Sequence, residues 1–133
     1  MRIVLDTNIW ISYLLSHHLS WLDHFFKNPE FHLLFSEQLL SEFLRVAKKP
    51  KLQKYFSDKQ LTDLLLRFEE YGVMIDVHSN YELCRDPDDN FLLNLAVDGH
   101  ANFLVSGDDD LLVLGKIDTC QIISLTQLKE HIS

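Results

Sequence analysis

The sequence predicts an α/β fold in which helices cover a mostly parallel sheet of about five strands. The first reason is alternation: short apolar runs are separated by segments whose apolar residues recur at helical spacing. The second reason is the opening run, Ile3–Leu5, which is apolar at every position, as expected of a strand buried on both faces. The links between these segments are short, which favours a single layered α/β sandwich.

Each expected strand is a short apolar run bounded by polar or turn-forming residues. The five expected strands are Ile3–Leu5, Phe31–Phe35, Val73–Val77, Phe103–Val105 and Gln121–Ile123.

Each expected helix is an amphipathic segment delimited by a polar cap, a glycine or a proline. The expected N-caps are Asn8, Ser20, Ser36, Ser57 and Thr126, and Ser57 also forms a capping box with Gln60. The expected ends are Leu15, Asn28-Pro29, the residue before Pro50, Gly72 and Gly99, the last closing a helix that includes Phe91.

Length and composition indicate one domain, residues 1–133, with 47% apolar residues spread along the chain. No apolar run approaches the roughly 18 residues of a membrane span, and the N-terminus lacks the pattern of a signal peptide. Cys84 and Cys120 stand apart, which favours reduced thiols in a cytoplasm, although one disulfide remains open at this stage. We therefore expect a cytoplasmic protein without a membrane partner.

Charge is unevenly distributed along the chain. The net charge of −8 by itself argues against a nucleic-acid partner. Ten of the 20 acidic residues lie between Asp76 and Asp118, however, and such a cluster repels itself unless cations offset it. A group of basic residues lies elsewhere and either guides an RNA backbone or decorates a solvated helix end; it comprises Arg45, Lys48, Lys49, Lys51 and Lys54.

Four acidic residues occupy positions from which they can meet. Asp6 and Asp108 each follow an apolar strand, and Asp89 begins a helix after a proline turn. In a doubly wound sheet, strand carboxyl ends and the following helix N-termini converge on one edge, and Glu42 can reach that edge from its helix. For each residue there is a plainer alternative: Asp89 as a helix cap, the aspartates after strands as turn residues, and Glu42 as a solvated side chain.

Carboxylates gathered in a cleft need a counter-charge, and a hard divalent cation supplies it. Mg²⁺ binds oxygen ligands and keeps several waters, so two to four carboxylates suffice. The seven histidines lack the spacing of zinc ligands.

Four blocks of the sequence, in this order, resemble the PIN-domain ribonucleases, most closely their toxin branch, which is VapC-like. The blocks are Val4–Asn8, Ser36–Val46 with Glu42, Arg85–Asp89 followed by Leu92 and Ala96, and Leu104–Leu112. The resemblance covers nearly the whole chain and implies a three-layer α/β/α, Rossmann-like sandwich. It carries the acidic set of the family over to Asp6, Glu42, Asp89 and Asp108, with Asp110 as an accessory ligand.

The resemblance also implies an activity: an endoribonuclease that hydrolyses RNA phosphodiester bonds with one or two Mg²⁺ or Mn²⁺ ions. Asp6 would be the central metal ligand, with Asp89 and Asp108 completing the set, and Glu42 would position the attacking water. Thr7, Asn8 and Ser106 would orient these carboxylates or contact phosphate, or else act only in capping and turns. A toxin of this kind would have a cognate antitoxin protein, and homodimers are common in the family.

Two other interpretations remain open. A haloacid-dehalogenase-like phosphatase also has an aspartate after its first strand, but it needs a second aspartate where this chain has Asn8. A catalytically weak PIN-like module that binds RNA or protein would usually have lost one or more acids, and here all four are present.

Overall fold

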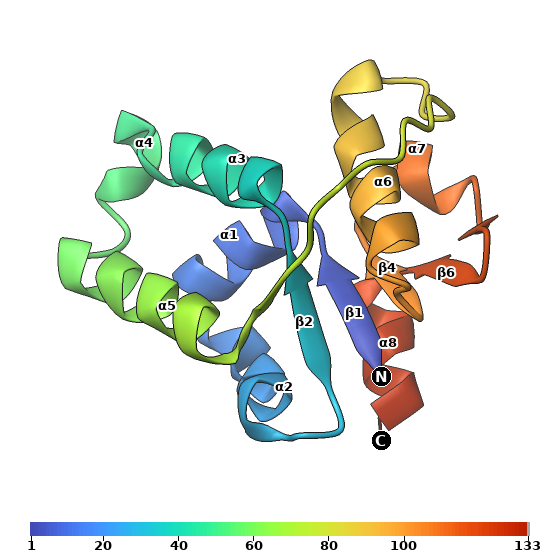
Figure 1. Ribbon diagram of the computed structural model, residues 1–133. Helices are drawn as coiled ribbons and strands as arrows, with labels where there is room; N and C mark the ends of the chain where they lie inside the picture. The colour runs from blue at the N-terminus through green and yellow to red at the C-terminus, as the bar shows by residue number, and fades with distance from the viewer. Residues whose placement is uncertain (133) are drawn as a thin grey trace.

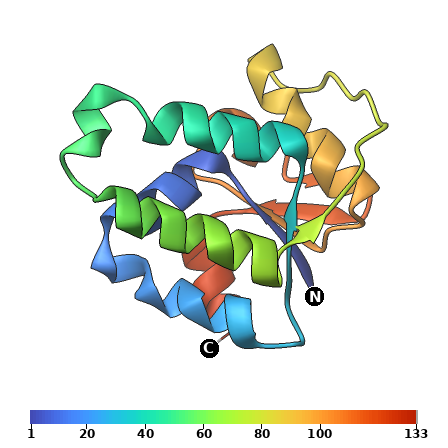
Figure 2. The ribbon, with the colours of Figure 1, turned by 60° about the vertical axis from the view of Figure 1, so that its left-hand side comes forward.

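The computed structural model describes residues 1–132 and contains a six-stranded sheet between two layers of helices (Figures 1 and 2). The strand order is β3-β2-β1-β4-β6-β5, and among the described strands only the β5–β6 pair is antiparallel. The strands are β1 (Arg2–Leu5), β2 (His32–Phe35), β3 (Val73–Met74), β4 (Phe103–Val105), β5 (Lys116–Ile117) and β6 (Cys120–Ile123). The three-layer α/β/α fold with a mostly parallel sheet is thus confirmed. The additional strand, β5, has two residues and was not expected because no apolar run marks it.

The helices follow the expected alternation with the strands. They are α1 (Thr7–Leu15), α2 (Asp23–Lys27), α3 (Glu37–Ala47), α4 (Pro50–Gln53), α5 (Asp58–Tyr71), α6 (Asn90–Asp98), α7 (Asp109–Leu112) and α8 (Leu125–Ile132), with 3₁₀ helices η1 (His17–Leu22) and η2 (Pro87–Asp89).

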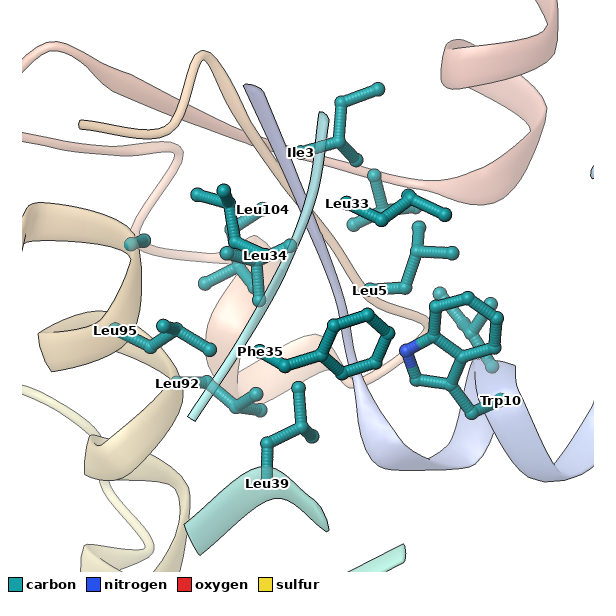
Figure 3. Packing of buried hydrophobic residues seen from close by; sticks show 14 of the residues in the cluster. Ile3, Leu5, Trp10, Leu33, Leu34, Phe35, Leu39, Leu92, Leu95 and Leu104 are labelled. Atoms are coloured by element: carbon teal, nitrogen blue, oxygen red, sulfur yellow. The ribbon is translucent and has the colours of Figure 1, made fainter. Parts of the chain in front are cut away.

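The central strands bury both faces, as the unbroken apolar run predicted. In β1, Ile3, Val4 and Leu5 are at most 1% exposed. Figure 3 shows how β2 divides its side chains between the two sides of the sheet: Phe35 lies toward Trp10 of α1, and Leu34 lies toward α6. Because helices cover both sides, an alternating polar pattern would leave unsatisfied groups in the core.

An aromatic cluster joins α1 and α5 to the sheet. The ring of Phe68 lies 4.6 Å from that of Trp10 and 4.6 Å from that of Phe35, measured between ring centres. Gly72 then ends α5 where β2 passes closely: a Cβ there would lie 2.5 Å from the Phe68 carbonyl oxygen and 2.7 Å from the Phe35 ring. A side chain at this position would therefore force the α5 backbone or the Phe35 ring to shift.

Three of the five expected N-caps were assigned to the wrong residue. Asp6, and not Asn8, caps α1; Ser16 caps η1 in the region where Ser20 was expected; and Ser124, and not Thr126, forms a capping box with Gln127. In each case two nearby polar residues could cap the helix, and the residue at which the helix begins determines which of them does. The caps at Ser36 and Ser57 are confirmed.

The strand expected over residues 73–77 is shorter than predicted. β3 covers only Val73–Met74, at the edge of the sheet, and the chain then leaves to cross α6 as an extended segment. Side chains on α6 hold this segment: Asp98 accepts the backbone N–H groups of His78 and Ser79, and Asn94 accepts that of Tyr81.

The two cysteines form no disulfide. Cys84 and Cys120 are both buried and free, and burial raises the pKa of the Cys120 thiol to about 12. Within residues 1–132, no helix combines the length and apolarity needed to cross a bilayer.

Candidate active site

Asp6 lies where β1 ends, at the carboxyl edge of the sheet. Its backbone N–H donates to the Val105 carbonyl oxygen at 3.0 Å, which ties it to the end of β4. One carboxylate oxygen, Oδ1, accepts the Asn8 N–H at 2.8 Å, and Oδ2 accepts the Ser106 hydroxyl at 2.6 Å. The side chain is only 5% exposed, and this burial raises its pKa, against the opposing effect of the two hydrogen bonds. Asp6 is therefore held in a defined position at an electrostatic cost.

Ser106 connects the carboxylate of Asp6 to the backbone of Asp108. Its side chain is fully buried, and its hydroxyl donates to Asp6 while accepting the Asp108 N–H at 3.0 Å. Asp108 in turn caps α7, because its Oδ1 accepts the Asp110 N–H at 2.9 Å. These contacts fix the position of the Asp6 carboxylate, and Ser106 itself does not line the cavity described below. The role expected for Ser106 at the site stays a prediction.

Asp89 comes to the same edge from the N-terminal end of α6. Asp86, and not Asp89, makes the capping bond of this region: it accepts the Asp88 N–H at 3.0 Å, while Asp89 makes no side-chain cap. Asp89 instead shares a hydrogen bond with Asp108. Burial, followed by that hydrogen bond and the charge of Asp108, raises the pKa of Asp89 to about 7. Asp89 therefore occupies the N-cap position of α6 without making a side-chain capping bond.

Glu42 reaches the same edge from α3, where it is paired with Arg45. Arg45 forms a two-pronged ion pair with it, with Nη2 at 2.6 Å from Oε1 and Nε at 3.3 Å from Oε2. This geometry orients the Glu42 carboxylate by two parallel hydrogen bonds. A sequence spacing of three residues on a helix allows such a pair but does not establish it.

These side chains surround one cavity of about 630 Å³ between α1, α3 and α6. All four predicted acids line it: Asp6, Glu42, Asp89 and Asp108. The other polar lining residues are Gln38, Arg45, Asp86 and Asp88. Of these, Arg45 was predicted only as one of the basic residues that could guide an RNA backbone, and Gln38 was not singled out. Thr7 and Asn8 also line the cavity. Thr7 is 6% exposed, and its hydroxyl oxygen has no hydrogen-bond partner within the described residues.

Asp110 is not brought to the cavity. Its carboxylate pairs with Arg85 at 3.2 Å, on the first turn of α7. The backbone N–H of Asp110 nevertheless donates to the Asp108 carboxylate, and the accessory role expected for Asp110 stays a prediction.

The side chains that line the cavity are of the chemical type that binds a hard divalent cation. Every acidic group at the cavity offers oxygen, and Mg²⁺ needs few protein ligands because it keeps several waters. The described residues contain no group of three or more His, Cys, Asp or Glu side chains arranged to hold a metal ion. Two carboxylates with waters are therefore the arrangement this geometry allows, and the unpartnered Thr7 hydroxyl adds a polar group directed to no protein atom.

Comparison with known proteins gives two results. The sequence model described as PIN domain matches residues 2–110. An uncharacterized protein of Methanocaldococcus jannaschii is 31% identical over 118 residues, which cover 86% of this chain and 75% of that protein. The matched region includes every residue that lines the cavity.

Proposed function

Because the chain belongs to the PIN domain family, whose members are generally nucleases, we propose that it is a divalent-metal-dependent endoribonuclease that hydrolyses RNA phosphodiester bonds. One observation carries the proposal: carboxylates from four separate segments line a single cavity at the carboxyl edge of parallel strands. In open α/β sheets this edge is where ligands bind.

Two of the three carboxylates of Asp6, Asp89 and Asp108 would bind the cation directly and the third through a water, with further waters completing its coordination. A bound Mg²⁺ or Mn²⁺ ion would supply the Lewis acid that activates water and offsets the charge of the scissile phosphate. Repulsion supports this assignment: the charge of Asp108 helps to raise the pKa of Asp89, and a bound cation would remove that electrostatic penalty.

The remaining residues would position the substrate and move a proton. Glu42 would accept the proton of the attacking water, since its carboxylate lines the cavity and Arg45 holds its orientation. Arg45 has further N–H groups that could donate to a phosphate oxygen. The Thr7 hydroxyl would donate to phosphate or to an ordered water, and Ser106 would keep Asp6 in place from behind.

The test measures cleavage of single-stranded and structured RNA in Mg²⁺ or Mn²⁺ and in chelator. Asp6→Asn keeps the side-chain shape and removes one charge, so we expect it to abolish metal-dependent cleavage. Asp109→Asn makes the same chemical change on an exposed residue outside the cavity and should leave cleavage unchanged. No metal-dependent cleavage by the wild type, together with no metal binding by calorimetry, would contradict the proposal.

A second candidate, a PIN-like module that binds RNA without efficient cleavage, is favoured by one observation. No three carboxylates of the described chain form a metal-binding group, and Glu42 is already paired with Arg45. RNA binding that survives in chelator, with no cleavage in either metal, would establish this alternative.

We extend the proposal to the role that the sequence resemblance implies, the toxin of a toxin–antitoxin pair. In that role the protein would have a cognate antitoxin and would form homodimers. Induced expression should then arrest growth of a bacterial host, and Asp6→Asn should relieve the arrest. Equal growth with both proteins would contradict the toxin role and leave the nuclease proposal intact.

A further inference from the structure

A protein with an acidic cavity must overcome repulsion to bind a polyanion. The chain carries a net charge of −8, and the carboxylates of the cavity add a local negative field. Exposed charges act over a Debye length of about 8 Å at physiological salt. Cations that assist an RNA backbone must therefore lie close to the cavity entrance.

One part of the chain that borders the cavity is rich in cations. Residues 43–57, here called the basic segment, hold five cations and no acidic residue, whereas the rest of the chain carries the other seven cations and all 20 acids. The basic segment comprises the C-terminal half of α3, α4 and the turns that flank α4. Its cations are Arg45, Lys48, Lys49, Lys51 and Lys54.

The lysines of the basic segment are not used in holding the fold together. All four side chains are exposed, and none of them forms an ion pair within residues 1–132. Lys54 lies 5.3 Å from the centre of the Tyr55 ring, which is itself 63% exposed. A large exposed ring flanked by an ammonium group offers a stacking surface beside a positive charge.

The basic segment is continuous with the cavity. Gln38, Glu42 and Arg45 line the cavity from one face of α3, because residues three and four positions apart share a helix face. Lys48 and Lys49 lie three and four positions beyond Arg45, at the C-terminal end of α3, and Lys49 is the N-cap of α4. Figures 1 and 2 show α3 leading from the strand ends outward to α4.

We propose that the basic segment binds the sugar–phosphate backbone of single-stranded RNA that flanks the scissile bond, with one base stacked on Tyr55. The lysines contact phosphates, and Arg45 marks the point where the strand enters the cavity. A single strand is required because a base paired within a duplex does not expose its face to an aromatic side chain. The assignment of the flanking strand to a cleavage substrate rests on the proposed function.

The experiment measures binding of a fluorescein-labelled single-stranded 12-mer of mixed sequence by anisotropy, in chelator and at several salt concentrations. Chelator prevents metal-dependent cleavage, so binding is measured independently of catalysis. The test variant changes Lys48, Lys49, Lys51 and Lys54 to alanine. The chain offers a matched control, since its other four lysines (Lys27, Lys59, Lys116 and Lys129) are also exposed and their substitution changes the net charge by the same amount.

For single strands, each phosphate contact contributes about 0.7 to the slope of log affinity against log salt, so the test variant should lose a slope of up to about 3. At low salt its Kd should rise by roughly tenfold or more, and the control variant should change its Kd by less than about threefold. Equal weakening by the two variants would show a general charge effect and would overturn the proposal, as would undetectable binding by the wild type.

Two further arms distinguish the stacking contact and the partner class. Tyr55→Phe should bind RNA as the wild type does, whereas Tyr55→Ala should weaken binding by about tenfold, the effect of one lost stacking contact. Equal affinities of these two variants would overturn the Tyr55 assignment.

The partner class is tested with phosphatidylserine vesicles. If the lysine variant lost binding to these vesicles but kept RNA binding, the basic segment would be a membrane-binding surface and the RNA proposal would be overturned. Lysine-dependent RNA binding by a protein that never cleaves RNA would support the basic segment while contradicting the nuclease.

Discussion

Replacing Ser106 by alanine is a sharp perturbation of the candidate site, because it removes one atom that serves two carboxylate-bearing residues. The hydroxyl donates to Asp6 at 2.6 Å and accepts the Asp108 N–H at 3.0 Å, in a fully buried position. Alanine fits the same space, so the change removes polar contacts without adding volume.

The magnitude follows from the two lost hydrogen bonds. The bond to the Asp6 carboxylate involves a charged group, for which the net contribution is about 1.5–3 kcal/mol. The Asp108 N–H is only partly buried and can bind cavity water, so its loss falls near the lower end of about 1–3 kcal/mol. We therefore expect Ser106→Ala to lower the free energy of unfolding by about 2–4 kcal/mol.

The sign of the pH dependence can also be derived. The Ser106 hydrogen bond lowers the pKa of Asp6, opposing burial, so its loss raises that pKa further. In the variant, ionised Asp6 is less well accommodated in the folded state, so the stability deficit should grow as the pH rises above the ordinary Asp value of 3.8.

Urea unfolding monitored by the fluorescence of the buried Trp10 measures both effects. Ser41→Ala, at an exposed position on α3, is the control and should change stability by less than about 0.5 kcal/mol. A Ser106→Ala deficit below about 1 kcal/mol, or one that does not change between about pH 4 and pH 8, would refute the view that Ser106 stabilises an ionised Asp6. If Asp6 is a metal ligand, Mg²⁺ affinity should also fall by roughly 10- to 100-fold.

Two more predictions concern the electrostatics of the cavity and the end of α5. The pKa of Asp89 is raised from the ordinary value of 3.8 to about 7, so at pH 5 the folded state keeps a proton that the unfolded state has released. The free energy of unfolding in chelator should therefore fall as the pH rises from 5 to 8. Asp89→Asn should reduce this fall. Melting temperatures at pH 5 and pH 8 measure this loss of stability, with Asp109→Asn as the control. If Asp89→Asn lost as much stability between the two pH values as the wild type, the raised pKa of Asp89 would be contradicted. Gly72→Ala places a Cβ 2.5 Å from a carbonyl oxygen and should lower the free energy of unfolding in urea by about 1–3 kcal/mol. Gly107→Ala is the control, because no atom lies within 4 Å of its Cβ, and it should not destabilise the fold. Equal effects of the two substitutions would refute the argument from close approach at Gly72.

The layered fold could be predicted because its cause is local in sequence. A strand covered by helices on both sides must be apolar at successive positions, and the run Ile3–Leu5 shows this directly. The strand order and the short β5 could not be predicted, because backbone pairing between distant segments leaves little trace in composition. N-caps were predictable at Ser36 and Ser57, where one polar residue precedes the helix, and not where Asp6 competes with Asn8.

The candidate site divides in the same way. Sequence alone determined which acids follow buried strands or begin a helix, and parallel topology sends such positions to one edge; the four predicted acids accordingly line one cavity. Only the tertiary structure decided what each carboxylate contacts there. Arg45 pairs with Glu42, Ser106 supports Asp6 from the end of β4, about a hundred residues away, and Arg85 pairs with Asp110. These contacts depend on the directions of side chains on elements distant in sequence, which spacing along the chain does not encode.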